Sequence, residues 1–374
     1  MKKIKQSLLL IDDILPVDFL GSGYPRSRAI ILMANKLGWD VTVYPMSVSG
    51  LNFSEVKSSF PDSVKLIQEG KGESGLLAFL INLKKPFDCL IVSRTHNRMA
   101  FERVLKKAPR VVVSNRFIYD SEAIFAEREI ISKKLNGQDV SNTEALSLVG
   151  SEIALMSKEM DGVSCVSLRD AIIFKFFMRN THHKVFALQY PVNLRHNTPS
   201  FSSRNGLIFI ARLKERSSPN SQGLIWFLSK VFPIIRKQNP EITLTIIGAL
   251  PPNSKIKKVD GVNWLGAIED LEPFYDGARL LIAPVFVASG IPLKIINAVA
   301  NGVPVVATKR MGDLLDWPSS AMPTSNSELD FAQKVLGIYQ SKLEWETTLK
   351  ISQSLVEEQF SFERFEENLA SLLS

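Results

Sequence analysis

Residues 289–308 hold the most specific chemical pattern in the chain. They read SGIPLKIINAVANGVPVVAT, in which Gly290 precedes a helical pattern that opens at Pro292 and carries Lys294 one turn in. Proline suits the first turn of a helix, where the backbone N–H has no partner. The free N–H groups of that turn, the positive end of the helix dipole and the lysine together favour a pyrophosphate. We therefore predict an anion site formed by Gly290, Ile291, Pro292 and Lys294.

Two cationic clusters follow other apolar runs. Arg94 and His96 lie in SRTHNR directly after DCLIV, where a phosphate or a sugar would bind, and Arg94 is a candidate binding residue for such a ligand. His96 can donate a hydrogen bond to a sugar hydroxyl or carry a proton. Arg212 lies in ARLKERSSPN after LIFIA and is a candidate phosphate clamp. For both clusters the alternative is a solvated surface group without a ligand.

A glycine loop follows the first apolar run. Its sequence GSGYPR contains Gly23 and places Arg26 where a dinucleotide fingerprint would have its third glycine. Because the fingerprint is incomplete, a dehydrogenase is not the favoured interpretation. The glycines still permit a tight turn that aims backbone N–H groups at an anion, with Arg26 adding a fixed positive charge. An ordinary turn with a solvated arginine is the alternative.

The elements that must position these residues are of one kind. Short apolar runs alternate with helical patterns along the chain, which indicates βαβ units around parallel sheets. The runs are continuous, as expected for strands that are covered on both faces. Strands are predicted at 7–11, 40–45, 88–93, 110–114, 163–168, 185–188, 207–211, 242–248, 262–266, 280–285 and 303–308. Helices are predicted at 26–37, across 120–160 with a break near 136–137, at 221–237, 270–277 and 293–301, and from about 361.

The chain is predicted to form two domains. Its 374 residues suit two cores of Rossmann size, and residues 190–206 are typical of a linker because they are rich in Pro, Asn and Ser. We predict an α/β fold with two facing doubly wound domains, 1–195 and 196–355, and a ligand cleft between them. Residues 356–374 contain a last helix with one apolar face, which must dock on another surface.

Composition narrows the partners. The net charge of +7 suits nucleotide phosphates, acidic membrane surfaces or nucleic acid, although it also serves plain solubility. The sequence lacks the aromatic-basic interleaving that is typical of nucleic-acid binding. Lysine clusters at 2–5 and 84–85 are compatible with peripheral contact at an anionic membrane. No CxxC or HExxH pattern occurs, so we predict neither a metal nor another cofactor.

The predicted compartment is the cytoplasm. Cys89 and Cys165 lie in apolar runs, which is typical of buried free thiols in a reducing environment. The apolar run before Asp12 is too short for a signal-peptide core or a membrane span. It predicts a first buried strand instead.

Several of these segments together resemble the retaining group 1 (family 4) glycosyltransferases of the GT-B fold, and the resemblance covers most of the chain. In the C-terminal half it is carried by VNWLGAIEDLEPFYDGARLLIAPV, followed by GIPLK and NGVPVVAT. In the N-terminal half it is carried by SGYPR and NKLGWDVTVYP. The segments YDSEAIFAERE and LIFIARLKERSSPNSQGLIWFL resemble a bacterial subgroup that builds surface polysaccharides.

For the N-terminal half, the resemblance implies that Gly23 and Arg26 face the donor phosphate or the reaction centre. It implies that His96 orients the donor sugar. The reaction would be a front-face substitution with retention, in which the leaving phosphate helps to deprotonate the acceptor and no dedicated nucleophile is needed. The terminal helix would cross back to the N-terminal domain.

For the C-terminal half, the resemblance implies that Arg212 and Lys294 neutralise the diphosphate as it leaves. The backbone from Leu265 and Gly266 to residue 268 would hold the base.

The chain departs from the family at one motif. The usual motif has two glutamates separated by seven residues, and the matching positions here are Ser289 and Asn297. Asparagine can hydrogen-bond ribose hydroxyls without charge, whereas serine replaces a carboxylate poorly. The identity of the donor therefore stays open.

The expected function is transfer of a hexose from a nucleotide-diphosphate sugar to a glycan or lipid-linked acceptor. The setting would be bacterial polysaccharide or lipopolysaccharide synthesis at the inner face of the plasma membrane. Two alternatives stay open. A sugar-nucleotide epimerase of the same architecture would need acid–base carboxylates, for which Asp120 and Glu122 are the candidates. A non-catalytic protein that binds a nucleotide sugar is the other.

Overall fold

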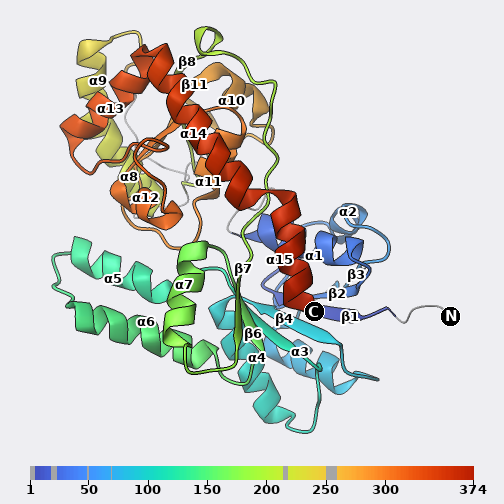
Figure 1. Cartoon of the computed structure of the whole chain (residues 1–374). Helices are drawn as coiled ribbons and strands as arrows, with labels where there is room; N and C mark the ends of the chain where they lie inside the picture. Colours follow the sequence, from blue (N-terminus) through green and yellow to red (C-terminus); the bar gives the residue numbers. More distant parts are fainter. Residues whose placement is uncertain (1–4, 18–22, 49, 69, 214–217, 250–258) are drawn as a thin grey trace. The chain divides into compact units, whose positions relative to one another are not determined.

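The computed structural model describes residues 5–17, 23–48, 50–68, 70–213, 218–249 and 259–374. The chain forms two compact units (Figure 1). Unit 1 comprises Met1–Pro191 with Phe362–Ser374, and unit 2 comprises Val192–Ser361. The lysine cluster at 2–5 was considered compatible with membrane contact. Two of its lysines, Lys2 and Lys3, lie outside the described residues. No helix among the described residues is long and apolar enough to cross a bilayer.

Unit 1 is built on a seven-stranded parallel sheet in the order β3-β2-β1-β4-β5-β6-β7. The strands are β1 (Ser7–Asp12), β2 (Asp40–Pro45), β3 (Lys65–Leu66), β4 (Cys89–Ser93), β5 (Phe117–Ser121), β6 (Gly162–Cys165) and β7 (Lys184–Ala187). The helices are α1 (Tyr24–Lys36), α2 (Phe53–Ser58), α3 (Gly72–Ile81), α4 (Thr95–Lys107), α5 (Phe125–Leu135), α6 (Asn142–Met156), α7 (Leu168–Phe177) and α15 (Phe362–Leu373).

The continuous apolar run of β1 is explained by helices on both faces of this sheet. Leu8 and Leu10 belong to one buried cluster, while Leu9 and Ile11 belong to another, and none of the four is exposed to solvent. Side chains of successive strand residues point to opposite faces, so both sets must be apolar. The apolar face of α15 joins the first cluster through Leu369 and its neighbours, and this helix packs on α1 and β7.

One predicted strand of unit 1 is wrong. Residues 110–114 form no regular strand, and only an isolated bridge joins Ser114 to Phe87. The strand beside β4 is β5, whose residues pair with β4 on one side and β6 on the other. Val112 in the predicted run is 65% exposed, so its β propensity is not matched by burial. The helix predicted from 120 therefore begins only at Phe125, after β5 has ended.

Unit 2 is built on a five-stranded parallel sheet in the order β10-β9-β8-β11-β12. The strands are β8 (Asn205–Ile210), β9 (Leu244–Ile247), β10 (Val262–Gly266), β11 (Ala278–Ala283) and β12 (Val305–Ala307). The helices are α8 (Pro219–Trp226), α9 (Phe232–Gln238), α10 (Glu272–Gly277), α11 (Leu293–Ala300), α12 (Lys309–Leu315), α13 (Glu328–Gln340) and α14 (Lys342–Phe360), with a short 3-10 turn η2 (Phe201–Ser203).

The helix predicted at 221–237 is confirmed in its extent but interrupted in its middle. A π-helical turn, η3 (Phe227–Val231), separates α8 from α9. Pro233 lies in the first turn of α9 and has no N–H to donate to the preceding turn, so the regular hydrogen-bond ladder cannot continue through it. The apolar stripe is kept: Phe227 and Phe232 are both buried against the sheet of unit 2.

Both sheets are doubly wound, and in each the strand order reverses at one place, which we call the switch point. The switch point lies between β1 and β4 in unit 1 and between β8 and β11 in unit 2. Ligands of such sheets bind outside the carboxyl ends of the strands beside it. The predicted site residues that follow these four strands are Gly23, Arg26, Arg94, His96, Arg212 and the segment 289–297.

Candidate functional site

In unit 2, the segment that leads from β11 into α11 turns at Gly290. This residue has a φ of 70°, in the left-handed region that favours glycine. Pro292 occupies the N-cap and the helix begins at Leu293, so the proline lies one position before the first turn in which the sequence placed it. The N–H of Leu293 donates to the Ile291 carbonyl at 3.0 Å.

Side chains after β12 hold this segment in place. Thr308 Oγ1 donates to the Val285 carbonyl, and Arg310 Nε donates to the Ala288 carbonyl at 2.9 Å. Both acceptors are backbone groups of the connection between β11 and α11. The position of the helix start therefore does not depend on a bound ligand.

Lys294 meets residues that follow β8. Its Nζ donates to the side-chain oxygen of Asn220 at 2.7 Å, and the Asn220 amide donates to the Arg212 carbonyl at 3.4 Å. The ammonium also lies 5.6 Å from the centroid of the Phe209 ring. The structure thus brings Lys294 and the Arg212 backbone together at the switch point, and the Arg212 side chain is exposed to solvent.

The electrostatics of Lys294 favour an anion. Burial lowers the pKa of its ammonium to about 8. Its recorded hydrogen bond goes to a neutral amide, and within the described ranges no carboxylate pairs with it. An anionic ligand would stabilise the protonated lysine and supply the missing counter-charge.

Asn297 and Ser289 stay close to the same helix start. Asn297 is three residues after Lys294 on α11, which places both side chains on one face of the helix. The Asn297 amide is partly exposed and forms no side-chain hydrogen bond in the described part of the chain. Ser289 is also partly exposed, in the segment between β11 and α11.

The predicted base-binding residues end β10. Leu265 is 42% exposed, and Gly266 has a φ of 74°. The Gly266 carbonyl accepts the N–H of Gly248 at 2.7 Å, which ties the end of β10 to the end of β9. An exposed leucine at the carboxyl edge of the sheet gives an apolar surface for a flat base.

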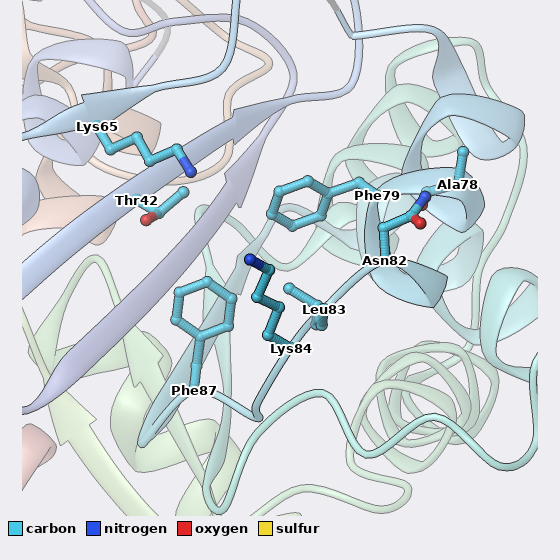
Figure 2. A pocket seen from close by; sticks show the side chains of 8 residues that line it. All are labelled: Thr42, Lys65, Ala78, Phe79, Asn82, Leu83, Lys84 and Phe87. Atoms are coloured by element: carbon cyan, nitrogen blue, oxygen red, sulfur yellow. The ribbon is translucent and has the colours of Figure 1, made fainter.

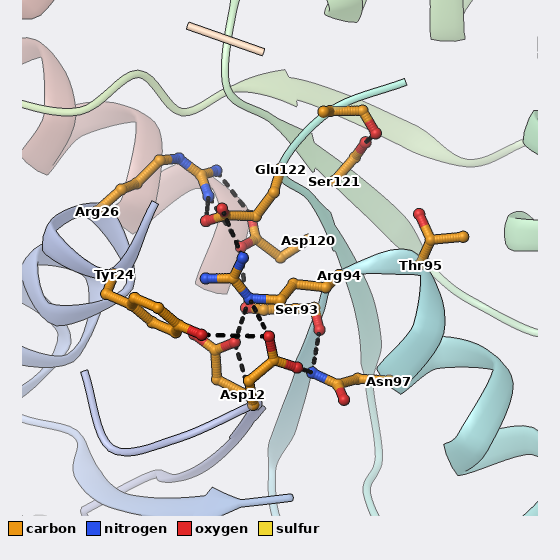
Figure 3. A network of polar contacts seen from close by, with 12 residues as sticks. Asp12, Tyr24, Arg26, Ser93, Arg94, Thr95, Asn97, Asp120, Ser121 and Glu122 are labelled. Atoms are coloured by element: carbon orange, nitrogen blue, oxygen red, sulfur yellow. Dashed lines mark hydrogen bonds and ion pairs between the residues drawn. The ribbon is translucent and has the colours of Figure 1, made fainter. Parts of the chain in front are cut away.

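In unit 1, the predicted residue Arg26 lies in a buried network at the ends of β1, β4 and β5 (Figure 3). Its guanidinium donates to both carboxylate oxygens of Asp120, at 2.7 and 2.8 Å, and its Nε donates to the Leu188 carbonyl at 2.6 Å. Only 2% of the arginine is exposed. The structure therefore gives Arg26 an internal ion pair, not the solvated or phosphate-facing position that the sequence suggested.

Asp120 is the centre of this ion pair. Its oxygens also accept hydrogen bonds from Ser93 Oγ at 2.9 Å and from Ser164 Oγ. Burial opposes ionisation of the carboxyl, but the Arg26 charge and the hydroxyl donors outweigh it and lower the pKa of Asp120.

Arg94 bridges two further carboxylates. Its Nε donates to Asp12 Oδ1 at 2.6 Å, its Nη1 lies 3.3 Å from Glu122 Oε2, and its guanidinium stacks 4.4 Å from the Tyr24 ring centroid. Arg94 has a φ of 77°, which is strained for a residue with a side chain. The ion pairs on both sides hold it in this conformation.

Gly23 and Glu122 are in close contact. Gly23 has a φ of 84°, and a Cβ there would lie 1.7 Å from Glu122 Oε2, so both the conformation and the space require glycine. Burial raises the pKa of Glu122 to about 7, although Arg94 and Arg26 act against the shift.

His96 lies at the exposed edge of the network. Its Nε2 hydrogen-bonds Asp13 Oδ1, which also accepts from Asn97 Nδ2 at 2.9 Å. The hydrogen bond to Asp13 raises the pKa of His96 above its ordinary value. With 60% of its side chain exposed, the imidazole remains accessible to a ligand.

The sequence analysis missed several members of these clusters. It assigned no role to Asn220 or Asp13, and it named Asp12 only as the residue that follows the first apolar run. The available signal was position: each directly follows a predicted strand or begins the next helix. Polar residues at those points deserve weight even without a motif.

Part of the chain matches a protein-family model, and a smaller part matches a curated protein. Residues 204–341 match the family model described as "Glycosyl transferases group 1". An uncharacterized 44.6 kDa protein of the cps region of Klebsiella pneumoniae is 37% identical over 99 residues, which are 24% of this chain and 26% of that protein. The match therefore spans about a quarter of the curated relative.

Solved structures match along nearly the whole chain. Sucrose-phosphate synthase of Thermosynechococcus elongatus has a TM-score of 0.70 at 14% identity, over 98% of both chains. The pneumococcal O-GlcNAc transferase GtfA, with UDP and GlcNAc, has a TM-score of 0.71 at 12% identity, over 99% of both. Anabaena HepE, with UDP-glucose, has a TM-score of 0.67 at 13% identity, over 98% of this chain and 99% of that one.

The fold is GT-B. Its two parallel-sheet units of seven and five strands are the predicted pair of doubly wound domains. At these identities the structural likeness shows the fold alone.

Proposed function

We propose that the protein is a glycosyltransferase that takes its sugar from a nucleotide-diphosphate donor. One observation carries the proposal: Lys294, an ammonium with no carboxylate partner among the described residues, lies at the start of α11 and at the switch point of unit 2. This unit contains the segment that matches the glycosyl transferase family model.

In the proposed reaction, the bond between the anomeric carbon of the sugar and the terminal phosphate oxygen breaks. The diphosphate leaves with an added negative charge, the acceptor oxygen forms a bond to the anomeric carbon, and the proton of the acceptor hydroxyl passes to the diphosphate. Lys294, the N–H groups of Gly290 and Ile291, and Arg212 stabilise this charge. We propose retention by front-face substitution, in which the acceptor attacks from the side on which the diphosphate leaves, so no protein nucleophile is assigned.

The rest of the donor would bind along the same sheet edge. Leu265 and Gly266 would hold the base, and Asn297 would hydrogen-bond the ribose hydroxyls, with Ser289 near the sugar. The role that the resemblance gives to His96 at the donor sugar stays a prediction.

The donor and acceptor classes rest on relatives. HepE and GtfA are structural neighbours whose crystals hold UDP-glucose, or UDP with GlcNAc. We propose a UDP-hexose donor on this basis. We propose a glycan or lipid-linked acceptor in surface-polysaccharide synthesis, for which the cps-region relative is the support. We further propose that the transfer takes place at the cytoplasmic face of the plasma membrane.

The test is incubation of the full chain with UDP-, GDP- and dTDP-sugars and measurement of the free nucleoside diphosphate. We expect release from one donor class, and a loss of at least about tenfold in kcat/KM in Lys294→Ala. Lys237→Ala on α9, which removes the same charge outside the site, is the matched control. Equal turnover in the two variants would refute the assignment of the site.

The same assay separates the alternatives. An epimerase would return an inverted sugar nucleotide without releasing nucleoside diphosphate. Asp120, one of its two candidate carboxylates, is occupied on both oxygens by Arg26. Binding of a sugar nucleotide without either product would indicate the non-catalytic alternative.

A further inference from the structure

A pocket with a volume of about 480 Å³ lies in unit 1 beside the end of α3 (Figure 2). Its wall includes Thr42 of β2, Lys65, which begins β3, and Phe87, which precedes β4. The strands are parallel and Asp12 ends β1, so the pocket faces the amino-terminal part of the sheet, away from the network of Figure 3. We call it the α3 pocket.

The aromatic walls of the α3 pocket are fixed by their neighbours. The Phe79 ring packs against Tyr44 with a centroid separation of 5.0 Å. The N–H of Phe87 donates to the Val113 carbonyl at 2.9 Å, and its carbonyl accepts from Asn115 at 2.9 Å. Pre-formed apolar walls reduce the entropy that a ligand must lose on binding.

Two lysines and a threonine of the α3 pocket have no side-chain partner among the described residues, whereas the Asn82 amide donates to the Ala78 carbonyl. In Figure 2 the ammonium ends of Lys65 and Lys84 point into the space between the Phe79 and Phe87 rings. Neither lysine forms an ion pair within the described ranges, and the residues that line the pocket include no carboxylate. Thr42 is only 8% exposed, and its hydroxyl makes no hydrogen bond in the part of the chain that the structure describes.

Lys65 and Lys84 are exposed to water, and an anion between their ammonium groups would be attracted by both. The Thr42 hydroxyl has no protein partner in the described part of the chain and can donate to a ligand. The apolar walls, which would cover part of a hydrocarbon chain, are formed by Ala78, Phe79, Leu83 and Phe87. A ligand that matches this pocket would have an anionic head with several acceptor oxygens and an apolar body.

We propose that the α3 pocket binds a phosphate monoester carried on an apolar chain. The phosphate oxygens accept from Lys65, Lys84 and the Thr42 hydroxyl, and the chain lies between Phe79 and Phe87. Such a phosphate comes either from a free molecule or from a bilayer lipid. The site is separate from the donor site and does not depend on the proposed glycosyl transfer.

The first test is calorimetric titration of the full chain with octyl phosphate below its micelle-forming concentration. We expect saturable binding, with octanol and inorganic phosphate each at least about tenfold weaker because one half of the contacts is missing. Absence of octyl phosphate binding at about 1 mM would overturn the proposal.

Matched variants locate the binding. Lys84→Gln and Lys65→Gln should each weaken octyl phosphate about tenfold, while Lys85→Gln, the adjacent lysine outside the pocket, should bind as the wild type does. Thr42→Val keeps the volume and should weaken binding about threefold. If Lys84→Gln and Lys85→Gln bind equally, the pocket is not the site. Donor turnover should be unchanged in all four variants, which separates this result from the proposed function.

Vesicles that contain phosphatidylglycerol distinguish the two sources. Vesicle binding that is reduced in Lys84→Gln but kept in Lys85→Gln assigns the pocket to a bilayer lipid. Octyl phosphate binding without vesicle binding assigns it to a free molecule. Equal vesicle binding by both variants, together with equal octyl phosphate binding, would refute the pocket for both sources.

Discussion

The two switch points of this molecule have opposite electrostatics. In unit 1, four carboxyl groups share two guanidinium groups: Asp12, Asp13, Asp120 and Glu122 surround Arg26 and Arg94. In unit 2, Lys294 has an amide as its hydrogen-bond partner. The first cluster contains counter-charges for its cations, whereas the second needs an anion from outside.

The comparison shows that position in the fold does not by itself make an anion site. Arg26 and Lys294 are both cations beside a helix start and a switch point. The carboxylate of Asp120 already pairs with Arg26, whereas no described carboxylate approaches Lys294. We therefore propose unit 2 as the diphosphate site, and we expect the network of unit 1 to act mainly in stabilising the fold.

The largest expected effect is that of Arg26→Ala in the buried network of unit 1. It leaves Asp120 buried without its cation, which should cost unit 1 about 3–5 kcal/mol in free energy of unfolding. Hydrogen exchange of β4 and β5 measures unit 1 separately from unit 2. Arg28→Ala, on the same helix but with a partly exposed side chain that donates to a neutral hydroxyl, should cost less than about 1 kcal/mol. A similar loss in both variants would show that the ion pair is not what stabilises unit 1.

The burial of Glu122 predicts a pH dependence of the stability of unit 1. Folded Glu122 keeps its proton up to a pKa of about 7, whereas the unfolded chain releases it near 4.5. The folded state thus binds more protons between these values, and stability falls as pH rises through them.

Glu122→Gln should remove this fall and gain on the order of 2 kcal/mol over the wild type between pH 5 and about 7. Urea unfolding at several pH values measures the difference. Glu129→Gln on α5 is the control, because its carboxylate is exposed. Parallel pH profiles for wild type and Glu122→Gln would contradict the raised pKa.

The Lys294 site of unit 2 also predicts a decrease with rising pH, but in ligand affinity and over a higher pH range. Lys294 is protonated below its pKa of about 8 and loses its charge above it. UDP binding should weaken about tenfold as pH rises from about 7.5 to 9.5. Lys294→Met should bind UDP weakly and without this dependence, and Lys237→Met should follow the wild type. Calorimetry across this pH range is the measurement.

The smallest expected effect concerns His96. Asp13→Asn removes the charged acceptor that holds its proton, so the pKa of His96 should fall. Proton NMR titration of the imidazole gives the value directly, with the other three histidines as internal reference. An unchanged His96 titration would mean that the Asp13 contact does not persist in solution.

Local sequence patterns predicted most of the fold because the strands are covered on both faces. Runs such as SLLLI and LIFIA need no partner to be recognised, since burial requires continuous apolar residues. The β5 segment FIYDS escaped because it ends in Asp120 and Ser121, whose polar groups are satisfied inside the network. The run at 110–114 has the composition of a strand without the burial.

The candidate site was predictable only in part. Lys294 and Gly290 are neighbours in sequence, so their pattern was visible at a helix start. The Arg26–Asp120 pair joins residues 94 positions apart, and no local rule indicates which carboxylate takes the guanidinium. Asn220 reaches Lys294 across 74 positions for the same reason.

Helix α15 belongs to unit 1 but is synthesised after unit 2, so unit 1 cannot complete its fold before then. It packs on α1 and β7 of unit 1, yet residues 362–374 leave the ribosome after every residue of unit 2. Domains usually fold as units while the chain emerges, the N-terminal one first. Here the groove that receives Phe365 and Leu369 stays uncovered until unit 2 has been made. The nascent chain must therefore carry an exposed apolar surface on unit 1 throughout the synthesis of unit 2, and a chaperone that shields such surfaces has its longest opportunity there.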